Sequence, residues 1–285
     1  MKAPARPVSV KNERRQLSSR FLRFEHSSVH LLRNRTVLWN VSRNELRARY
    51  AGSLLGVAWT MLAPLSLLAI YATVYIVILR VSIPSLGPVQ YAIFIFAGLV
   101  PFMMNAEALS AGVSSVLANA SVLNNTVFPI DLVPVKAVLL SQAVMVAGMS
   151  VVLVGALTAG LLSWTAILLP VIWILHVIAL VGLSWCLSLL TIVVRDMSYA
   201  VTLLIAALYV LSPIAYTREM VPPALAPLIW LNPLAYYIMS YQDVLVRGRI
   251  PAFAQIIAML AISSVLFGLG GWFFSRAKRV MVDYL

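Results

Sequence analysis

The chain carries little charge over most of its length and contains a single cysteine. Only 11% of its 285 residues are charged, and 12 of the 21 Lys and Arg residues lie within the first 56 positions. The one cysteine, Cys186, sits in an apolar run, which excludes a disulfide framework and a thiolate metal site. The composition is 62% hydrophobic, which is more apolar than a soluble domain of this length needs.

The sequence also lacks the short motifs of common catalytic sites. It contains no G-x-x-x-x-G-K-[ST], so ATP binding through a P-loop is not expected. H-E-x-x-H, C-x-x-C and G-x-S-x-G are missing as well. Glu107 and His176 do not make a cluster of acid, base or metal ligands, so we predict no catalytic residue, metal or cofactor in this chain. A membrane-embedded lipid-modifying enzyme stays an alternative of a different class, and no filter-like loop supports an ion channel.

Long apolar segments fill the sequence after position 56. A membrane-spanning helix needs ~20 mainly apolar residues. Six segments meet this requirement: 57–79, 92–117, 135–161, 165–194, 197–215 and 253–274. The sequence therefore predicts an all-α integral membrane protein with six transmembrane helices. Small residues within the spans, such as Gly182 and Ser184, indicate close helix packing, and His176 is expected to be a hydrogen-bonded packing residue.

The distribution of cations predicts the orientation of these spans. With both termini in the cytoplasm, 17 Lys and Arg residues lie inside and only four lie outside: Arg80, Arg218, Arg247 and Arg249. This asymmetry agrees with the positive-inside rule. It also argues against nucleic acid as a partner, because the cations concentrate where a membrane surface is expected.

The N-terminal region divides into two parts before the six-span domain of residues 57–275. Residues 1–30 are polar and basic without an apolar h-region, so we expect a disordered cytoplasmic tail and not a cleaved signal peptide. Residues 31–56 are predicted to contain an interfacial helix on the inner leaflet, with a solvated basic linker as the alternative. Its apolar stripe comprises Leu32, Trp39, Leu46 and Tyr50. Residues 276–285 are expected to form a basic cytoplasmic tail.

Two connections between spans are unusual. Residues 118–134 are interrupted by Pro129 and Pro134, and they suit either a short helix that another protein grips or an ordinary loop. Residues 212–251 are too apolar for a free loop and too rich in proline for one span, which predicts a re-entrant outer helical hairpin between spans five and six. Its aromatic residues either form an interfacial belt or contact sugar rings along a substrate path: Tyr216, Trp230, Tyr236 and Tyr237.

Polar residues within the spans are few. Glu107 follows Pro101 and Asn105, so it is expected to line a polar path or to cap a neighbouring helix. Arg47 and Arg49 stand where the predicted interfacial helix meets the first span. They either anchor the helix to anionic head groups or contact a charged substrate where it enters.

Several motifs occur in an order that resembles a known family. The segment before and within the first span resembles R-D-L-K-x-R-Y-x-x-S-x-L-G-x-x-W-x-x-x-x-P. The matching residues are Glu45, Leu46, Arg47, Arg49, Tyr50, Ser53, Leu55, Gly56, Trp59 and Pro64. The loop after span two resembles F-P-[RK]-[DE]-x-x-P through Phe128, Pro129, Asp131 and Pro134, with Ile130 in place of the usual cation. Arg195-Asp196 after span four, Asn232-Pro233 in the outer region and the basic C-terminus match further motifs. The chain is thus similar, over residues 35–285, to the membrane subunits of ABC-2-type polysaccharide exporters.

This resemblance implies a permease that forms a homodimer and pairs with a separate ATPase, which binds ATP and Mg. The cargo would be a glycan, such as O-antigen, teichoic acid or capsule, on a polyprenyl-pyrophosphate carrier in a bacterial cytoplasmic membrane. The substrate would enter at Arg47, Arg49 and Tyr50. The ATPase would couple through Asn124, Phe128, Pro129 and Asp131, while Arg195, Asp196, Asn232 and Pro233 would have structural or gating roles. A drug or small-lipid exporter of the same superfamily is the nearest alternative.

Overall fold

The computed structural model describes residues 34–49, 52–83, 86–125 and 129–281, and all regular structure in these residues is helical. Five helical segments are long and apolar enough to cross a membrane. Tyr50, Phe128 and the predicted tail 1–30 lie outside the described residues. The chain is therefore an all-helical multi-pass membrane protein, as the sequence predicts.

The five long segments agree closely with predicted spans one to four and six. Span one consists of α4 (Trp59–Ala72) and the π-helix η2 (Thr73–Ile78). Spans two to four are α5 (Pro88–Ala118), α7 (Leu132–Thr158), and η3 (Trp164–Leu168) continued by α8 (Leu169–Val193), and the last span is α12 (Phe253–Met281). The shorter helices are α3 (Arg35–Arg49), η1 (Gly56–Ala58), α6 (Ala120–Asn125), α9 (Met197–Leu211), η4 (Arg218–Met220), α10 (Ala226–Leu231) and α11 (Pro233–Leu245).

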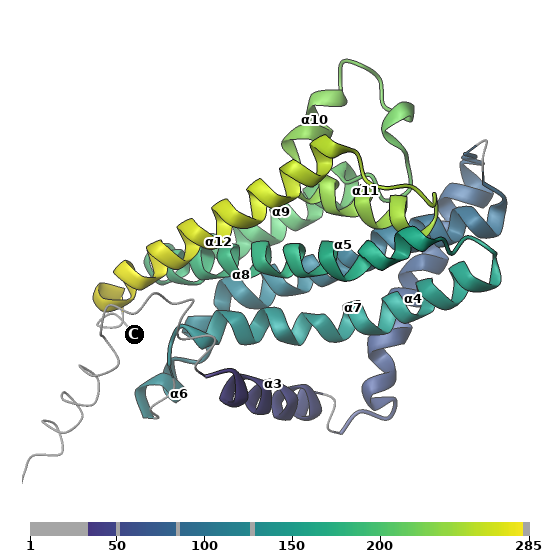
Figure 1. Cartoon of the computed structure of the whole chain (residues 1–285). Coiled ribbons are helices and arrows are strands. Elements are labelled where there is room, and N and C mark those ends of the chain that lie inside the picture. The colour runs from purple at the N-terminus through teal and green to yellow at the C-terminus, as the bar shows by residue number, and fades with distance from the viewer. Residues whose placement is uncertain (1–33, 50–51, 84–85, 126–128, 282–285) are drawn as a thin grey trace, which may run out of the picture.

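Helix α5 forms the centre of the bundle and packs against α4, α7, α8, α9 and α11 (Figure 1). Its start is fixed by Pro88 in the first helical position and by a hydrogen bond of 3.0 Å from the Gly87 N–H to Gln90 Oε1. Within the apolar stretch of α5, 72% of the residues are buried, against 6% in the first span. The first span thus presents most of its apolar surface to lipid or to another protein.

The fifth predicted span is shorter than expected. Helix α9 has 15 residues, so it rises only ~22 Å, less than the ~30 Å thickness of the hydrocarbon core. The helix ends at Leu211 because Ser212 precedes Pro213, and the proline ring disfavours helical geometry at the residue before it. Ser212 is extended, with ψ 141°, and the chain then runs irregularly through a buried stretch.

The region 212–251, for which the sequence predicts a re-entrant outer hairpin, contains the two short helices α10 and α11. Gln242 on α11 holds the irregular segment, since its Nε2 donates to the carbonyls of Pro213 (3.1 Å) and Ile214 (3.0 Å). The hydroxyl of Tyr91 on α5 donates to the Ala215 carbonyl. Irregular backbone is tolerated at membrane depth only when its polar groups are satisfied by protein or water, and these bonds meet that condition.

The C-terminal residues differ from the predicted tail. Helix α12 continues to Met281, so most of the segment 276–285 that was expected to be a free tail is helical. Lys278 within it is 2% exposed and not solvated. The reason is an ionic contact with a distant acid, described below, that sequence proximity could not reveal.

The charge asymmetry makes a testable prediction of orientation. After replacement of Cys186 by Ser, a cysteine at the exposed Glu219 should react with an impermeant thiol reagent from outside intact cells. A cysteine at the exposed Arg195 should react only after the inner face is opened. Labelling of position 195 in intact cells would contradict the orientation and, with it, the cytoplasmic placement of residues 118–134.

Candidate functional site

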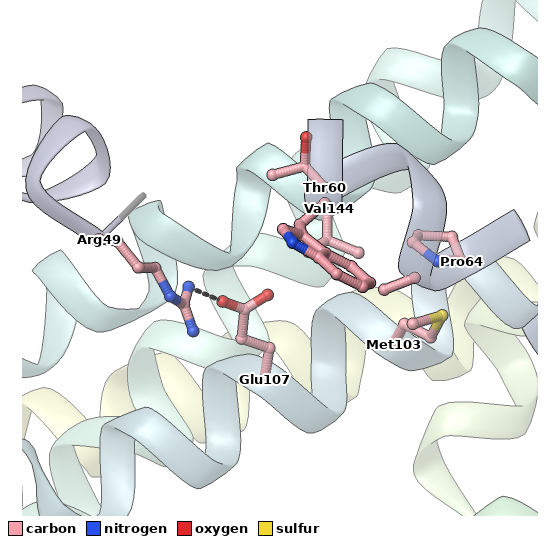
Figure 2. Close-up of a pocket in the computed structure, with 8 residues that line it drawn as sticks. Arg49, Thr60, Pro64, Met103, Glu107 and Val144 are labelled. Carbon is pink, nitrogen blue, oxygen red and sulfur yellow. Dashed lines mark hydrogen bonds and ion pairs between the residues drawn. The ribbon is translucent and has the colours of Figure 1, made fainter. Parts of the chain in front are cut away.

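An ion pair joins the end of α3 to α5, the central helix of the bundle. Arg49, in the last turn of α3, contacts Glu107 on α5 through Nη1 and Oε1, and the two side chains point toward one another in Figure 2. The pair brings together two residues that are 58 positions apart in the sequence. It places a predicted substrate-entrance residue, Arg49, beside a predicted path residue, Glu107.

A pocket of ≈ 270 Å³ surrounds this pair. Helices α3, α4, α5 and α7 all contribute to its walls, and Figure 2 shows several of the side chains around it. Its polar groups are Arg49, Thr60 and Glu107, and the remaining lining residues are Trp59, Ala63, Pro64, Met103 and Val144. The pocket therefore offers one cation, one carboxylate and a largely apolar wall.

The depth of Glu107 along α5 places the pocket near one edge of the membrane. At 1.5 Å per residue, the helix from Pro88 to Glu107 is ~29 Å long, close to the ~30 Å of the hydrocarbon core. Residues 108–118 continue beyond that level and lead to α6. The pocket thus lies at the level where head groups are expected, at the end of the bundle predicted to be cytoplasmic.

Helix α3 is held to the bundle by a second ion pair. It lies alongside α7 (Figure 1), where Lys136 Nζ contacts Glu45 Oε2 at 2.7 Å and donates to Asn119 Oδ1 at 3.1 Å. Leu38 and Ser42 are buried, whereas Trp39 of the predicted apolar stripe is 64% exposed. The helix predicted for 31–56 is therefore present as Arg35–Arg49, with Leu38 and Ser42 buried and Trp39 free to meet lipid. Arg47 is exposed.

Asp131 is buried, although the sequence analysis placed it among residues that dock the ATPase. Its carboxylate contacts Lys278 Nζ at 2.8 and 3.0 Å, and both side chains are under 5% exposed. The Trp185 indole N–H donates to the Asp131 backbone carbonyl at 3.0 Å. The side chain of Asp131 is enclosed within this chain. Asp131 ties the start of α7 to α8 and α12 instead.

The other predicted coupling residues are described only in part. Pro129 is partly exposed just before α7. Asn124 lies in α6, but the structure does not describe its side chain. Phe128 lies outside the described residues. The segment predicted for coupling therefore contains a short helix, α6, followed by a buried ionic contact.

The outer aromatic residues fall into two groups. Trp230 and Tyr236 pack together with ring centroids 5.8 Å apart, and the guanidinium of Arg218 lies 4.1 Å above the Trp230 ring. Tyr216 is partly buried and donates to the Leu211 carbonyl. These three aromatics lie in or beside the region that the sequence predicts to face outside.

Tyr237, in contrast, belongs to the core and does not line a path that is open in this chain. It is 2% exposed, its hydroxyl lies 2.7 Å from Ser263 Oγ, and its ring stacks on His176 at 4.5 Å. His176 was expected to be hydrogen-bonded, but neither ring nitrogen has such a partner among the described residues. Ring stacking holds this histidine instead.

The predicted gating residues have different environments. Asn232 caps α11, since its Oδ1 accepts from the Leu234 N–H at 3.0 Å while its Nδ2 donates to Ser212 Oγ at 2.9 Å. Pro233 occupies the first position of that helix. Arg195 and Asp196 are both exposed in the connection before α9.

Sequence reasoning missed Lys278 and Lys136 as functional candidates. Both appeared only as cations that set the orientation, and no local pattern distinguishes them from other cations near a membrane. Among the residues that the structure describes, no group of three or more His, Cys, Asp or Glu side chains could hold a metal ion.

Comparison with known proteins gives consistent results over most of the chain. The family described as "ABC-2 type transporter" matches residues 36–246. The chain is 30% identical over 213 residues to the O-antigen export system permease protein RfbA of Klebsiella pneumoniae, covering 74% of this chain and 80% of that protein. It is 26% identical to the protein of the same name from Myxococcus xanthus, over 89% of this chain and 96% of the relative. It is 22% identical to the polysialic acid transport protein KpsM of Escherichia coli, over 79% and 88% of the two chains.

The family match begins within α3 and includes both charged contacts of α3 and the residues that line the pocket. The helices from α4 to α11 and the segment 118–134 fall inside the family match, whereas α12 follows it. The chain belongs to the ABC-2 type transporter family of membrane permeases.

Proposed function

We propose that this chain is the permease subunit of an ATP-driven exporter that moves a lipid-linked polysaccharide across the bacterial cytoplasmic membrane. The observation that carries the proposal is the similarity, over 89% of the chain, to a protein named for O-antigen export. Another relative is named for polysialic acid transport. The names of both relatives therefore describe the transport of a glycan.

The proposed transporter contains two copies of this chain and two copies of a separate ATPase, which binds ATP and Mg. The sequence has no P-loop, so the energy must come from another chain. The first span and α9 leave apolar side chains exposed, among them Ile70 (58%), Leu203 (74%) and Val210 (73%). Exposed apolar surface of this extent suits lipid and the second permease copy.

The proposed coupling route starts at α3, α6 and Pro129, which lie at one end of the bundle. Closure of the ATPase would press on these elements. From there, the Asp131–Lys278 contact leads to α12 and the Trp185–Asp131 contact leads to α8. Asp131 is thus proposed to act through the interior, as a residue that positions the coupling segment.

The proposed cargo enters at the basic end of α3. Arg47 and Arg49 occupy its last turn, where cations are also favoured by the helix dipole. A guanidinium binds phosphate oxygens in a two-point geometry, which suits a pyrophosphate-linked carrier. The outer aromatic residues Tyr216, Trp230 and Tyr236 would meet sugar rings at the opposite side.

Two measurements test the proposal together. Deletion of the chain from its host should remove the surface polysaccharide and cause carrier-linked glycan to accumulate inside the cell. The purified chain should show no ATP hydrolysis alone, and hydrolysis should appear when the separate ATPase copurifies with it. Normal surface glycan after deletion, or strong ATP turnover by the single chain, would contradict the proposal.

A further inference from the structure

The carboxylate of Glu107 has an unusual setting for a charged group. Glu107 is the only ionisable residue among the 31 residues of α5 apart from Tyr91, and its side chain is 18% exposed. An ionised carboxylate close to the hydrocarbon is costly unless a cation compensates it. Arg49 supplies that cation from another helix, and its side chain remains 47% exposed. In this ion pair the Glu107 carboxylate is the more enclosed group and the Arg49 guanidinium is the more exposed one.

The volume and lining of the pocket suit a phosphate head group on a lipid. Its ≈ 270 Å³ lies at the small end of ligand pockets, which are about 300–1,000 Å³, so it has room for a head group with a few carbon atoms and not for a sugar chain. The apolar wall formed by Pro64, Met103 and Val144 suits an isoprenoid chain. Arg49 stands at its polar end.

We infer that this pocket binds the phosphate head group of the carrier lipid. When the cargo is absent, Glu107 pairs with Arg49 in place of the phosphate. The inference rests on the proposed function and adds a competing residue within the chain. Carboxylate and phosphate both accept hydrogen bonds from a guanidinium in the same forked geometry, so they compete for it. The head group displaces Glu107 when it binds.

Displacement of Glu107 has a mechanical consequence. The Arg49–Glu107 pair ties the last turn of α3 to α5, whereas Glu45 and Lys136 tie the preceding turn to α7. Binding of the head group breaks the Arg49–Glu107 pair and leaves the Glu45–Lys136 pair intact. The last turn of α3 is then released, while the preceding turn stays attached to the bundle.

The test measures equilibrium binding of radiolabelled farnesyl pyrophosphate to the purified permease–ATPase complex in phosphatidylcholine nanodiscs. Glu107→Gln should bind roughly three- to fivefold more tightly, because a partly exposed ion pair no longer competes with the probe. Arg49→Met should lose binding by more than about tenfold, since a charge-assisted contact disappears. The control Glu45→Gln breaks the other α3 ion pair without touching the pocket and should leave binding unchanged.

The sign of the Glu107→Gln effect decides between two roles. If Glu107 only orients Arg49, the variant should bind less tightly, and that result, or an unchanged affinity, would overturn the inference. The exchange Arg49→Glu with Glu107→Arg restores an ion pair between α3 and α5 but moves the cation into the bundle. It should keep the complex folded without restoring binding, and full recovery of affinity would also overturn the inference.

Competition experiments identify the source of the phosphate. Farnesyl monophosphate should displace the probe, whereas inorganic pyrophosphate should do so weakly, because it lacks the apolar tail. Displacement by phosphatidylglycerol in the nanodisc as effective as that by farnesyl monophosphate would overturn the assignment to the carrier. A complex that exports glycan in cells but does not bind the probe would overturn the pocket alone, whereas glycan export that persists without the chain would overturn the proposed function.

Discussion

Replacing Lys278 by Met is expected to lower the free energy of unfolding by about 3–5 kcal/mol, because it leaves the Asp131 carboxylate buried without its cation. The carboxylate and the ammonium lie 2.8 Å apart, and both side chains are almost completely enclosed. The measurement is the thermal unfolding midpoint of the purified complex in detergent, together with the amount of folded chain in the membrane. An unchanged midpoint would show that water or another cation compensates Asp131.

The matched double variant separates stability from coupling. Asp131→Leu combined with Lys278→Met removes both charges and fills the site with apolar atoms, which for buried ion pairs is often neutral or stabilising. The contact between Trp185 and the Asp131 backbone carbonyl does not depend on the side chain. We expect the double variant to fold normally but to lose most of its transport-linked ATP turnover, because the ionic connection to α12 is gone. Normal turnover would assign the pair to folding alone.

Replacing Gly182 by Ala is expected to disrupt the contact between α8 and α12. A Cβ atom there would lie 2.2 Å from the Leu266 carbonyl oxygen and 2.5 Å from the Phe267 backbone nitrogen. Both are backbone atoms, so no side chain can rotate away and the two helices must separate. Overpacking in a tightly packed interior costs about 1–3 kcal/mol and occasionally more, and this site belongs to the severe cases.

Gly268→Ala is the control for this substitution. Gly268 lies on the same helix, α12, and a Cβ atom there meets nothing within 4 Å. Alanine is favoured over glycine in a helix interior by roughly 0.5–1 kcal/mol, so this variant should be as stable as the parent or slightly more so. Equal unfolding midpoints for Gly182→Ala and Gly268→Ala would contradict the close approach of α8 and α12.

The predicted bounds of the spans were accurate where the length of the apolar run alone determines them. α5, α7, α8 and α12 begin within a few residues of the predicted positions because each is a long apolar run between polar or proline-containing segments. The fifth span was less accurate. The apolar residues continue past Leu211, so composition extends the span, but Pro213 ends the helix and Gln242 then takes over the backbone hydrogen bonds.

The candidate site was predictable in part. The sequence identified Glu107 as an ionisable residue within a span, whereas Arg49 and Asp131 were identified through their places in motifs that resemble the family's. It did not pair Arg49 with Glu107, and it placed Asp131 on a surface because the loop motif lies between two spans. The helix α3 was predicted from its apolar stripe and the motif from Glu45 to Pro64 from the family resemblance, whereas their contacts with α5 and α7 depend on how the helices cross.

The sequence by itself determined that this protein spans a membrane, which loops carry the cations and that no P-loop is present, because these properties follow from the order of residues along the chain. The tertiary structure alone decided which charges meet. Glu107 lies 58 positions from Arg49, and Lys278 lies 147 positions from Asp131, so only the packing of α3, α5, α7 and α12 brings them together. The energy of an ion pair depends on distance through space and on burial, and neither quantity is written in the local sequence.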